Sequence, residues 1–197
     1  DVQTSKITGF TKYLANIGQI NNKGFEFELS GDIVRTKDLT LNAGLNLSTL
    51  KSKVVKLNNG EDVIWYDPTG DNDNQLIYRE GYSPLSFYAY EHAGANSENG
   101  KPMWYLNNDK AGDLDVNGRA VTYTKNDADY VIIGCADPDF YGGFYTGLTY
   151  KGIGLNMNLT YSFGGDTYDM TAKDNADDGY YSARLMTQYY YDNRWLN

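Results

Sequence analysis

The chain has 197 residues and a formal net charge of −9. This acidity argues against a nucleic-acid partner, because phosphate-backbone binding needs a patch of Lys and Arg. With one cysteine and one histidine, the chain can form neither an internal disulfide nor a Cys/His zinc site.

Tyrosine is the unusual component of the composition, with 19 copies in a chain that is 22% charged. A tyrosine ring is apolar and its tip is polar, which suits membrane interfaces, wet grooves and sugar-binding surfaces. No run approaches the roughly 20 apolar residues that a membrane-spanning helix requires. The first residues also lack the basic start and apolar run of a signal peptide, so we expect a cytosolic chain or a start that lies further upstream.

The first predicted element is an amphipathic hairpin. Residues 24–33 alternate, with Phe25, Phe27, Leu29 and Ile33 on one face and Glu26, Glu28, Ser30 and Asp32 on the other. After a turn at 35–38, residues 39–50 place Leu39, Leu41, Ala43, Leu45 and Leu47 opposite Thr40, Asn42, Gly44, Asn46 and Ser48. Alternation with period two predicts two strands that share one apolar side.

Two long polar links follow this hairpin, at about 51–81 and 96–136, and both are rich in Asn, Asp and Gly. Between them, residues 86–94 are predicted to form one further strand. A compact domain seldom carries connections this long unless they have a function.

A second hairpin is predicted at residues 140–150 and 153–163, with its turn at Lys151 and Gly152. In its second strand, Ile153, Leu155, Met157, Leu159, Tyr161 and Phe163 alternate with Gly154, Asn156, Asn158, Thr160 and Ser162.

These elements predict an all-β fold of antiparallel strands from a large transmembrane β-barrel with long extracellular loops. Strands of ten or eleven residues suit a tilted bilayer crossing, and short turns at one end with long links at the other are typical of outer-membrane barrels. Phe25, Leu41, Leu45, Leu155, Met157 and Leu159 would then face lipid, and Glu26, Asn42, Asn46, Asn156 and Asn158 the lumen. A soluble sandwich or meander with one wet face is the alternative.

Few residues suggest catalysis or metal binding. Glu26 and Glu28 share a strand face and could pair in a surface glycosidase, but lumen-facing residues of a barrel are polar in any case. Residues 113–124 begin like a calcium loop, yet Thr124 stands where the closing Glu belongs, which favours a surface turn. His92 and Cys135 have no nucleophile motif around them. We therefore expect no catalytic residue, no metal and no cofactor.

Aromatic pairs in the links are the candidate binding residues. Exposed rings stack on sugar faces, and binding sites concentrate on loops held by a rigid scaffold. An aromatic girdle at the membrane interface is the alternative, because the pairs lie close to predicted strand ends. The substrate-binding candidates are Trp65, Tyr66, Trp104 and Tyr105.

Four segments of the chain carry motifs that can be compared with known families. Residues 16–57 carry the pattern N-x-G-x-x-x-N-x-G-x-E in Asn16, Gly18, Asn22, Gly24 and Glu26. Residues 80–105 contain G-x-x-P-x-x-F-Y-x-Y-x-x-x-G, residues 132–169 contain G-x-x-x-P-x-F-x-G-G at the entry to a hairpin, and the chain closes with YYDNRW. These segments resemble the SusC/RagA family of TonB-dependent outer-membrane transporters, in which the last of them corresponds to an N-R-W motif.

The resemblance implies energy-coupled import of an oligosaccharide or peptide across the outer membrane of a Gram-negative bacterium, and no enzyme activity. Its implied partners are a SusD-like surface lipoprotein, the TonB complex and membrane lipid. Residues 1–197 would be part of a barrel of about 22 strands, whose plug domain and last strands are absent here. The rival hypothesis is a soluble secreted all-β carbohydrate-binding domain.

Overall fold

In the computed structural model the residues described are 2–3, 12–13, 18–66, 75–176 and 186–193. The strands are β1 (Val2–Gln3), β2 (Lys12–Tyr13), β3 (Gln19–Arg35), β4 (Leu39–Lys56), β5 (Val63–Tyr66), β6 (Gln75–Tyr78), β7 (Ser86–Tyr90), β8 (His92–Ala95), β9 (Pro102–Tyr105), β10 (Leu114–Val116), β11 (Arg119–Thr122), β12 (Tyr130–Cys135), β13 (Phe140–Tyr150) and β14 (Ile153–Phe163). The helical elements are the 3₁₀ turns Asn58–Gly60 and Lys125–Asp127 and the short helices α1 (Met170–Asn175) and α2 (Gln188–Asn193).

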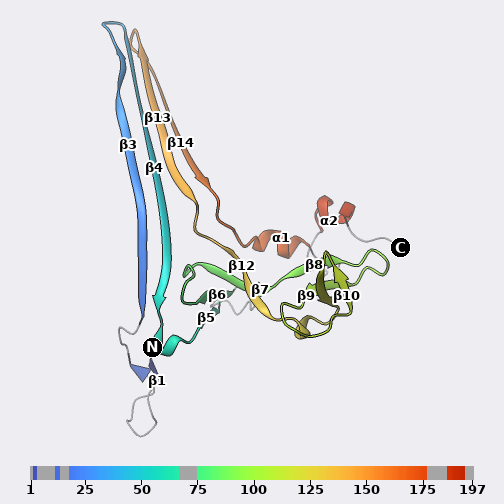
Figure 1. The fold of residues 1–197 in the computed structure, drawn as a ribbon. Helices are drawn as coiled ribbons and strands as arrows, with labels where there is room; N and C mark the ends of the chain where they lie inside the picture. The colour runs from blue at the N-terminus through green and yellow to red at the C-terminus, as the bar shows by residue number, and fades with distance from the viewer. Residues whose placement is uncertain (1, 4–11, 14–17, 67–74, 177–185, 194–197) are drawn as a thin grey trace. The chain divides into compact units, whose positions relative to one another are not determined.

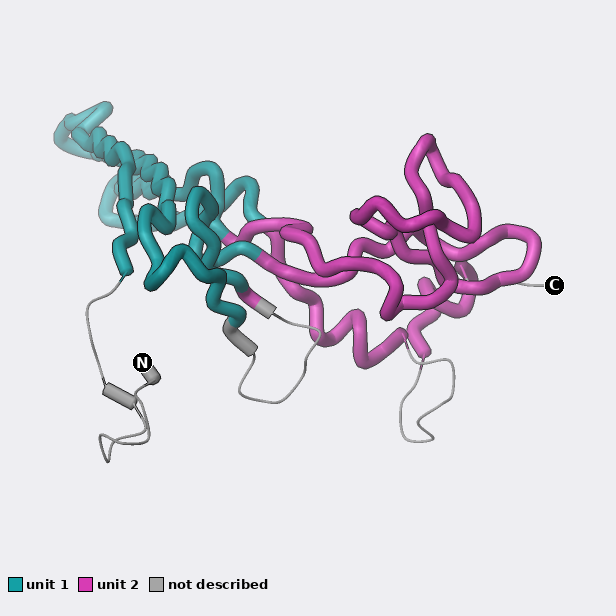
Figure 2. The backbone as a smooth tube through the Cα atoms, turned by 60° about the horizontal axis from the view of Figure 1, so that its bottom comes forward, with its two compact units in different colours: residues 1–65, 77–86, 137–165 teal, residues 66–76, 87–136, 166–197 magenta. Residues whose placement is uncertain are grey.

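The strands form three four-stranded sheets, in the orders β14-β13-β4-β3, β12-β7-β6-β5 and β10-β11-β9-β8, and β1 pairs with β2. The backbone divides into two compact units (Figure 2). Unit 1 holds residues 1–65, 77–86 and 137–165, and unit 2 holds residues 66–76, 87–136 and 166–197.

Both predicted hairpins are confirmed, and they join edge to edge in unit 1. β3 pairs with β4 and β13 with β14, and β13 also pairs with β4, from Leu39 opposite Tyr150 to Ser48 opposite Tyr141. The two turns lie at the same end of the sheet (Figure 1), where the Lys151 N–H donates to the Asp38 carbonyl at 2.8 Å. Lys151 and Gly152 both have positive φ, 47° and 87°, the conformation of a tight hairpin turn that matches the strand twist.

Two predictions of register and strand extent are wrong. A bulge between Asp32 and Val34 leaves Ile33 without a partner, so Val34 and not Ile33 stands opposite Leu41. The single strand predicted at 86–94 divides at Glu91 into β7 and β8, which belong to different sheets.

Most of the core of the described residues lies outside the long sheet; the exception is Val54 on β4, which extends to Lys56, past the end predicted at residue 50. The buried apolar side chains are Val54, Leu57, Ile77, Met103, Leu106, Val121 and Ala128. The links that the sequence suggested were long polar loops therefore fold into short strands, and they supply almost all of the buried side chains.

Candidate functional site

One face of the long sheet is apolar across all four strands. Residues directly opposite one another in an antiparallel pair point to the same side. One such row runs from Leu29 through Leu45 and Phe144 to Leu159. By the same register, the predicted residues Phe25, Leu41, Leu45, Leu155, Met157 and Leu159 share this face. We call it the apolar face.

The apolar face is exposed in the structure. Leu29 retains 65% of its accessible surface, Leu155 retains 66% and Leu159 retains 52%. A sandwich would bury these side chains against a second sheet about 10 Å away. An apolar surface of this extent is unfavourable in water and has to be covered by another protein surface or by lipid.

The opposite face is polar and carries the residues predicted for a lumen. Glu26 stands opposite Ser48 and Glu28 opposite Asn46, while Asn158 stands opposite Tyr145. Glu26 and Glu28 are exposed. Neither of these two carboxylates therefore lies in the dry pocket that a catalytic carboxylic acid requires.

The length of the apolar face matches a bilayer. β13 and β14 have 11 residues each, so at about 3.4 Å per residue they are roughly 34 Å long. A tilt of about 40° reduces this to roughly 26 Å, close to the apolar band of an outer-membrane barrel. Aromatic side chains mark both ends: Phe140 stacks on Phe163 at a centroid distance of 4.9 Å, and Tyr150 lies beside the turn at the other end.

Two tyrosines cover glycines on the neighbouring strand, one on each face. Tyr161 stands opposite Gly142 on the apolar face, and its hydroxyl donates to the Asn46 carbonyl at 2.6 Å. On the polar face Tyr145 stands opposite Gly44, which is buried. An aromatic ring over a cross-strand glycine fills the space that a side chain would occupy and fixes the register.

In unit 2, an ion-pair cluster joins segments that are distant in the sequence. The Arg119 guanidinium donates to both carboxylate oxygens of Glu91, at 2.8 and 2.7 Å, and to the Asn107 side-chain oxygen at 2.8 Å. The same guanidinium lies 3.7 Å from the centre of the Tyr105 ring. The hydrogen bond from Arg119 lowers the pKa of Glu91, and in return raises the pKa of Arg119.

The pKa shift of Glu91 predicts a pH-dependent stability of β9–β11. The pKa of Glu91 is lower in the folded protein than in the unfolded chain. The stabilisation by the ion pair is therefore complete at neutral pH and is lost as the pH falls through the pKa of the folded state. The side chains of Glu91 and Arg119 keep 34% and 45% of their exposure, so water screens the ion pair and keeps its contribution to stability small.

In the full-length protein, Glu91→Gln should therefore speed hydrogen exchange of β9–β11 by up to about fivefold at neutral pH, and the difference from wild type should vanish in acid. Glu98→Gln, in a nearby exposed turn, should change nothing. An effect of Glu91→Gln that persists in acid contradicts the role of the ion pair.

The four predicted binding residues do not form one described cluster. Trp104 and Tyr105 are neighbours on β9, so their side chains point to opposite sides of the sheet. Trp104 stands opposite His92 with the rings edge to face at 6.0 Å, whereas Tyr105 lies under Arg119. Trp65 and Tyr66 end β5, and their side chains lie outside the described part of the structure.

A tyrosine cluster that sequence reasoning did not assemble lies on β7 and β12. Tyr130 contacts Tyr90 at a centroid distance of 4.0 Å and Tyr88 at 5.4 Å, and the Lys125 ammonium lies 5.2 Å from the Tyr90 ring. The two-residue spacing of Tyr88 and Tyr90 was a visible signal of a shared face. Their partner Tyr130 lies 40 residues further on, where nothing local marks it.

The calcium-like stretch is a hairpin turn, as its missing Glu suggested. Asn117 and Gly118 connect β10 to β11 with positive φ, and Asp115 accepts the Gly118 N–H at 2.8 Å. Asp113 accepts the Tyr123 N–H and the Thr122 hydroxyl, and these bonds lower its pKa. Within the described ranges, no three acidic, His or Cys side chains are grouped to hold a metal.

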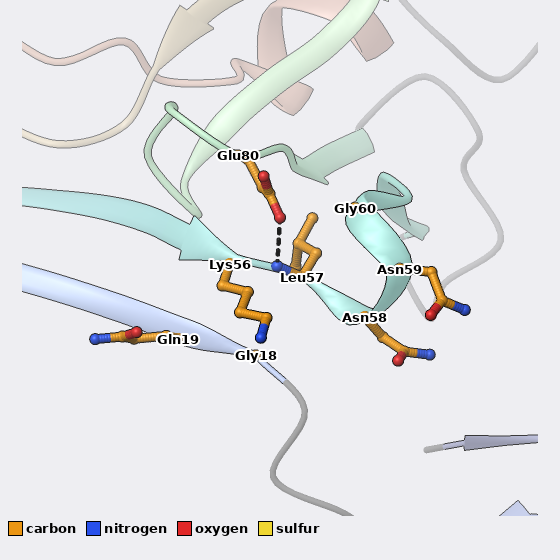
Figure 3. A pocket seen from close by; sticks show the side chains of 8 residues that line it. All are labelled: Gly18, Gln19, Lys56, Leu57, Asn58, Asn59, Gly60 and Glu80. Carbon is orange, nitrogen blue, oxygen red and sulfur yellow. Dashed lines mark hydrogen bonds between the residues drawn. The ribbon is translucent and has the colours of Figure 1, made fainter.

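A polar pocket of about 630 Å³ lies in unit 1 where β3 begins and β4 ends (Figure 3). Its lining residues are Gly18, Gln19, Lys56, Leu57, Asn58, Asn59, Gly60 and Glu80. The Glu80 carboxylate accepts the Leu57 N–H at 2.8 Å, which holds the 3₁₀ turn against the segment that contains Glu80. We assign Glu80 this structural role.

The helices in the described part of the chain have neither the length nor the apolar composition of a membrane-spanning helix.

Comparison with known proteins gives consistent relatives, although no protein-family model matches the chain. The chain is 34% identical over 174 residues to TonB-dependent receptor P3 of Formosa agariphila, covering 83% of this chain and 17% of that protein. It is 28% identical over 154 residues to TonB-dependent receptor SusC of Bacteroides thetaiotaomicron, covering 75% of this chain and 15% of that protein. The chain thus spans about one sixth of the length of these relatives.

Two solved structures are similar to the fold. The RagAB peptide transporter matches with a TM-score of 0.69 at 26% identity, covering 90% of this chain and 19% of that chain. The RagAB peptide importer in its closed-closed state matches with a TM-score of 0.64 at 30% identity, covering 82% of this chain and 17% of that chain.

Proposed function

Because the chain belongs to the SusC/RagA family of TonB-dependent receptors, we propose that it is part of the barrel of an outer-membrane nutrient importer. The observation that carries the proposal is the long sheet of unit 1, with an exposed apolar face and a polar opposite face. That pattern is what a transmembrane barrel needs between lipid and lumen.

The orientation follows from the connections. The short turns at 36–38 and 151–152 belong on the periplasmic side, and the link between β4 and β13 belongs on the extracellular side. Residues 1–197 would then supply four long barrel strands and one large extracellular segment. The plug domain and the remaining strands belong to the rest of the importer.

The cargo is an oligosaccharide or a peptide. A net charge of −9 disfavours a polyanionic cargo, and the partly exposed aromatic side chains of β7, β9 and β12 suit sugar rings or peptide side chains. A SusD-like surface lipoprotein would close over the extracellular segments, and TonB would supply energy through a part of the importer outside residues 1–197. The role of this protein is binding and gated passage rather than catalysis.

The aromatic residues Trp65 and Trp104 provide the test. Alanine at either position in the full-length protein should reduce uptake of labelled oligosaccharides or peptides several-fold while leaving the amount of inserted barrel unchanged. Removing a stacking ring costs about 1–3 kcal/mol when the ring contacts its ligand. Uptake by cells that lack TonB is the background that is subtracted from each measurement.

The outcomes separate two claims. If wild-type cells take up none of the labelled compounds in a TonB-dependent way, the importer proposal is wrong. If wild-type cells import and both variants match them, the importer stands, and Trp65 and Trp104 are loop packing or interface girdle.

A further inference from the structure

β3 and β4 continue past the end of β13, and this extension carries a cluster of lysines. On the apolar face, the row after Phe25 and Thr49 pairs Lys23 with Lys51, and the next row pairs Asn21 with Lys53. The face therefore changes within two residues from aromatic to basic. We call Lys23, Lys51 and Lys53 the lysine cluster.

The lysine cluster has no ion-pair partner in the part of the chain that the structure describes. All three side chains are exposed. Like charges directly opposite each other weaken a strand pair. In a chain with a net charge of −9, the exposed Lys23–Lys51 pair offers a local positive site to an anion from outside the protein.

The surface around the cluster is shaped to receive a ligand. A groove of about 430 Å³ is lined by Asn21, Lys23, Gly24, Phe25, Thr49, Lys51, Lys53 and Val55. Its lining is almost entirely apolar, formed by the lysine stems and the side chains of Phe25 and Val55, and the three exposed lysines add positive charge at this position. An amphiphile with an anionic head and an apolar body matches this combination.

The height of the cluster corresponds to lipid headgroups. Two residues along a strand cover about 6.8 Å, so the lysine rows lie roughly 7 and 14 Å beyond Phe25 along the strands. With a tilt of about 40°, they stand roughly 5 and 10 Å above the aromatic row, where the apolar band gives way to the membrane interface. Lysine stems can extend along apolar surface while the ammonium group remains in the polar layer.

We infer that the lysine cluster binds the phosphate groups of a phosphorylated glycolipid in the outer leaflet. The inference rests on the proposed function, because it needs the sheet to span the outer membrane with the long link outside. Lysine binds phosphate as a compact point charge, and three lysines around one groove can share the phosphate groups of such a headgroup. Each lysine near an anionic headgroup strengthens binding about fivefold.

The test compares two triple variants of the full-length protein: K23Q/K51Q/K53Q, which removes the charge, and K23R/K51R/K53R, which keeps it. Binding is measured to phosphatidylcholine nanodiscs that contain lipid A, with dephosphorylated lipid A as the second arm. We expect the glutamine variant to bind lipid A on the order of a hundredfold more weakly, and the arginine variant to bind as wild type does. Dephosphorylated lipid A should abolish the difference between the variants.

Each contrary result identifies which of the two proposals is wrong. Equal lipid A binding by the glutamine and arginine variants overturns the inference, and the importer proposal stands if wild-type protein inserts and transports. Displacement of lipid A by inorganic phosphate alone overturns it too, because the groove then takes a free anion. Failure of the wild-type protein to insert overturns both proposals.

Discussion

Arginine in place of Leu159 should destabilise the inserted full-length protein by about 2–4 kcal/mol, whereas arginine in place of Asn158 should cost much less. Leu159 stands opposite Phe144, midway between the aromatic ends of the apolar face. Its side chain would contact the middle of the lipid, where a guanidinium group loses its hydration. Asn158 is adjacent in the chain but faces the polar side, where water or the lumen receives the charge.

Depth provides an internal control for this prediction. Leu155 shares the apolar face but lies nearer the turn at Lys151, separated from it on this face only by the Tyr150–Ile153 pair. Leu155→Arg should therefore cost less than Leu159→Arg. The measurement is reversible unfolding of the full-length barrel from lipid vesicles. Equal costs at Leu159 and Asn158 contradict the assignment of the two faces.

Alanine in place of Gly142 should destabilise the sheet by about 1–3 kcal/mol, as overpacking does elsewhere. A methyl group at Gly142 would collide with the Asn46 carbonyl oxygen on β4, which is backbone and cannot rotate away. It would also lie 2.7 Å from the Tyr161 hydroxyl, which donates to that same carbonyl. The variant should therefore weaken the pairing of β13 with β4 and displace the tyrosine that covers the glycine.

Gly154 on β14 is the matched control. A methyl group there meets only the Thr149 hydroxyl, at 3.8 Å. Gly154→Ala should be neutral or stabilise by up to about 1 kcal/mol, because alanine restricts the unfolded chain more than glycine does. Thermal or denaturant unfolding of both variants measures the difference. If Gly142→Ala is as stable as Gly154→Ala, the close packing at Gly142 does not limit the sheet.

The sequence alone determined the two hairpins and their faces. Apolar and polar residues alternate within each strand, so Leu155 and Asn156 can be assigned to opposite faces of the sheet before the partner strand is known. The turn at Lys151 and Gly152 was equally local. The pattern failed at Ile33, because a bulge inserts one residue and reverses the parity beyond it.

The tertiary structure decided what depends on partners distant in the chain. The pairing of β4 with β13 crosses the whole intervening link, and alternation says which face is apolar but not which edge meets which. The short strands of the links have too few residues for a period to show, so their pairing becomes visible only when the backbone is placed. The same holds for Arg119 with Glu91 and for Lys23 with Lys51. These residues are far apart in the sequence, and their charges interact only because the folded backbone brings them close together.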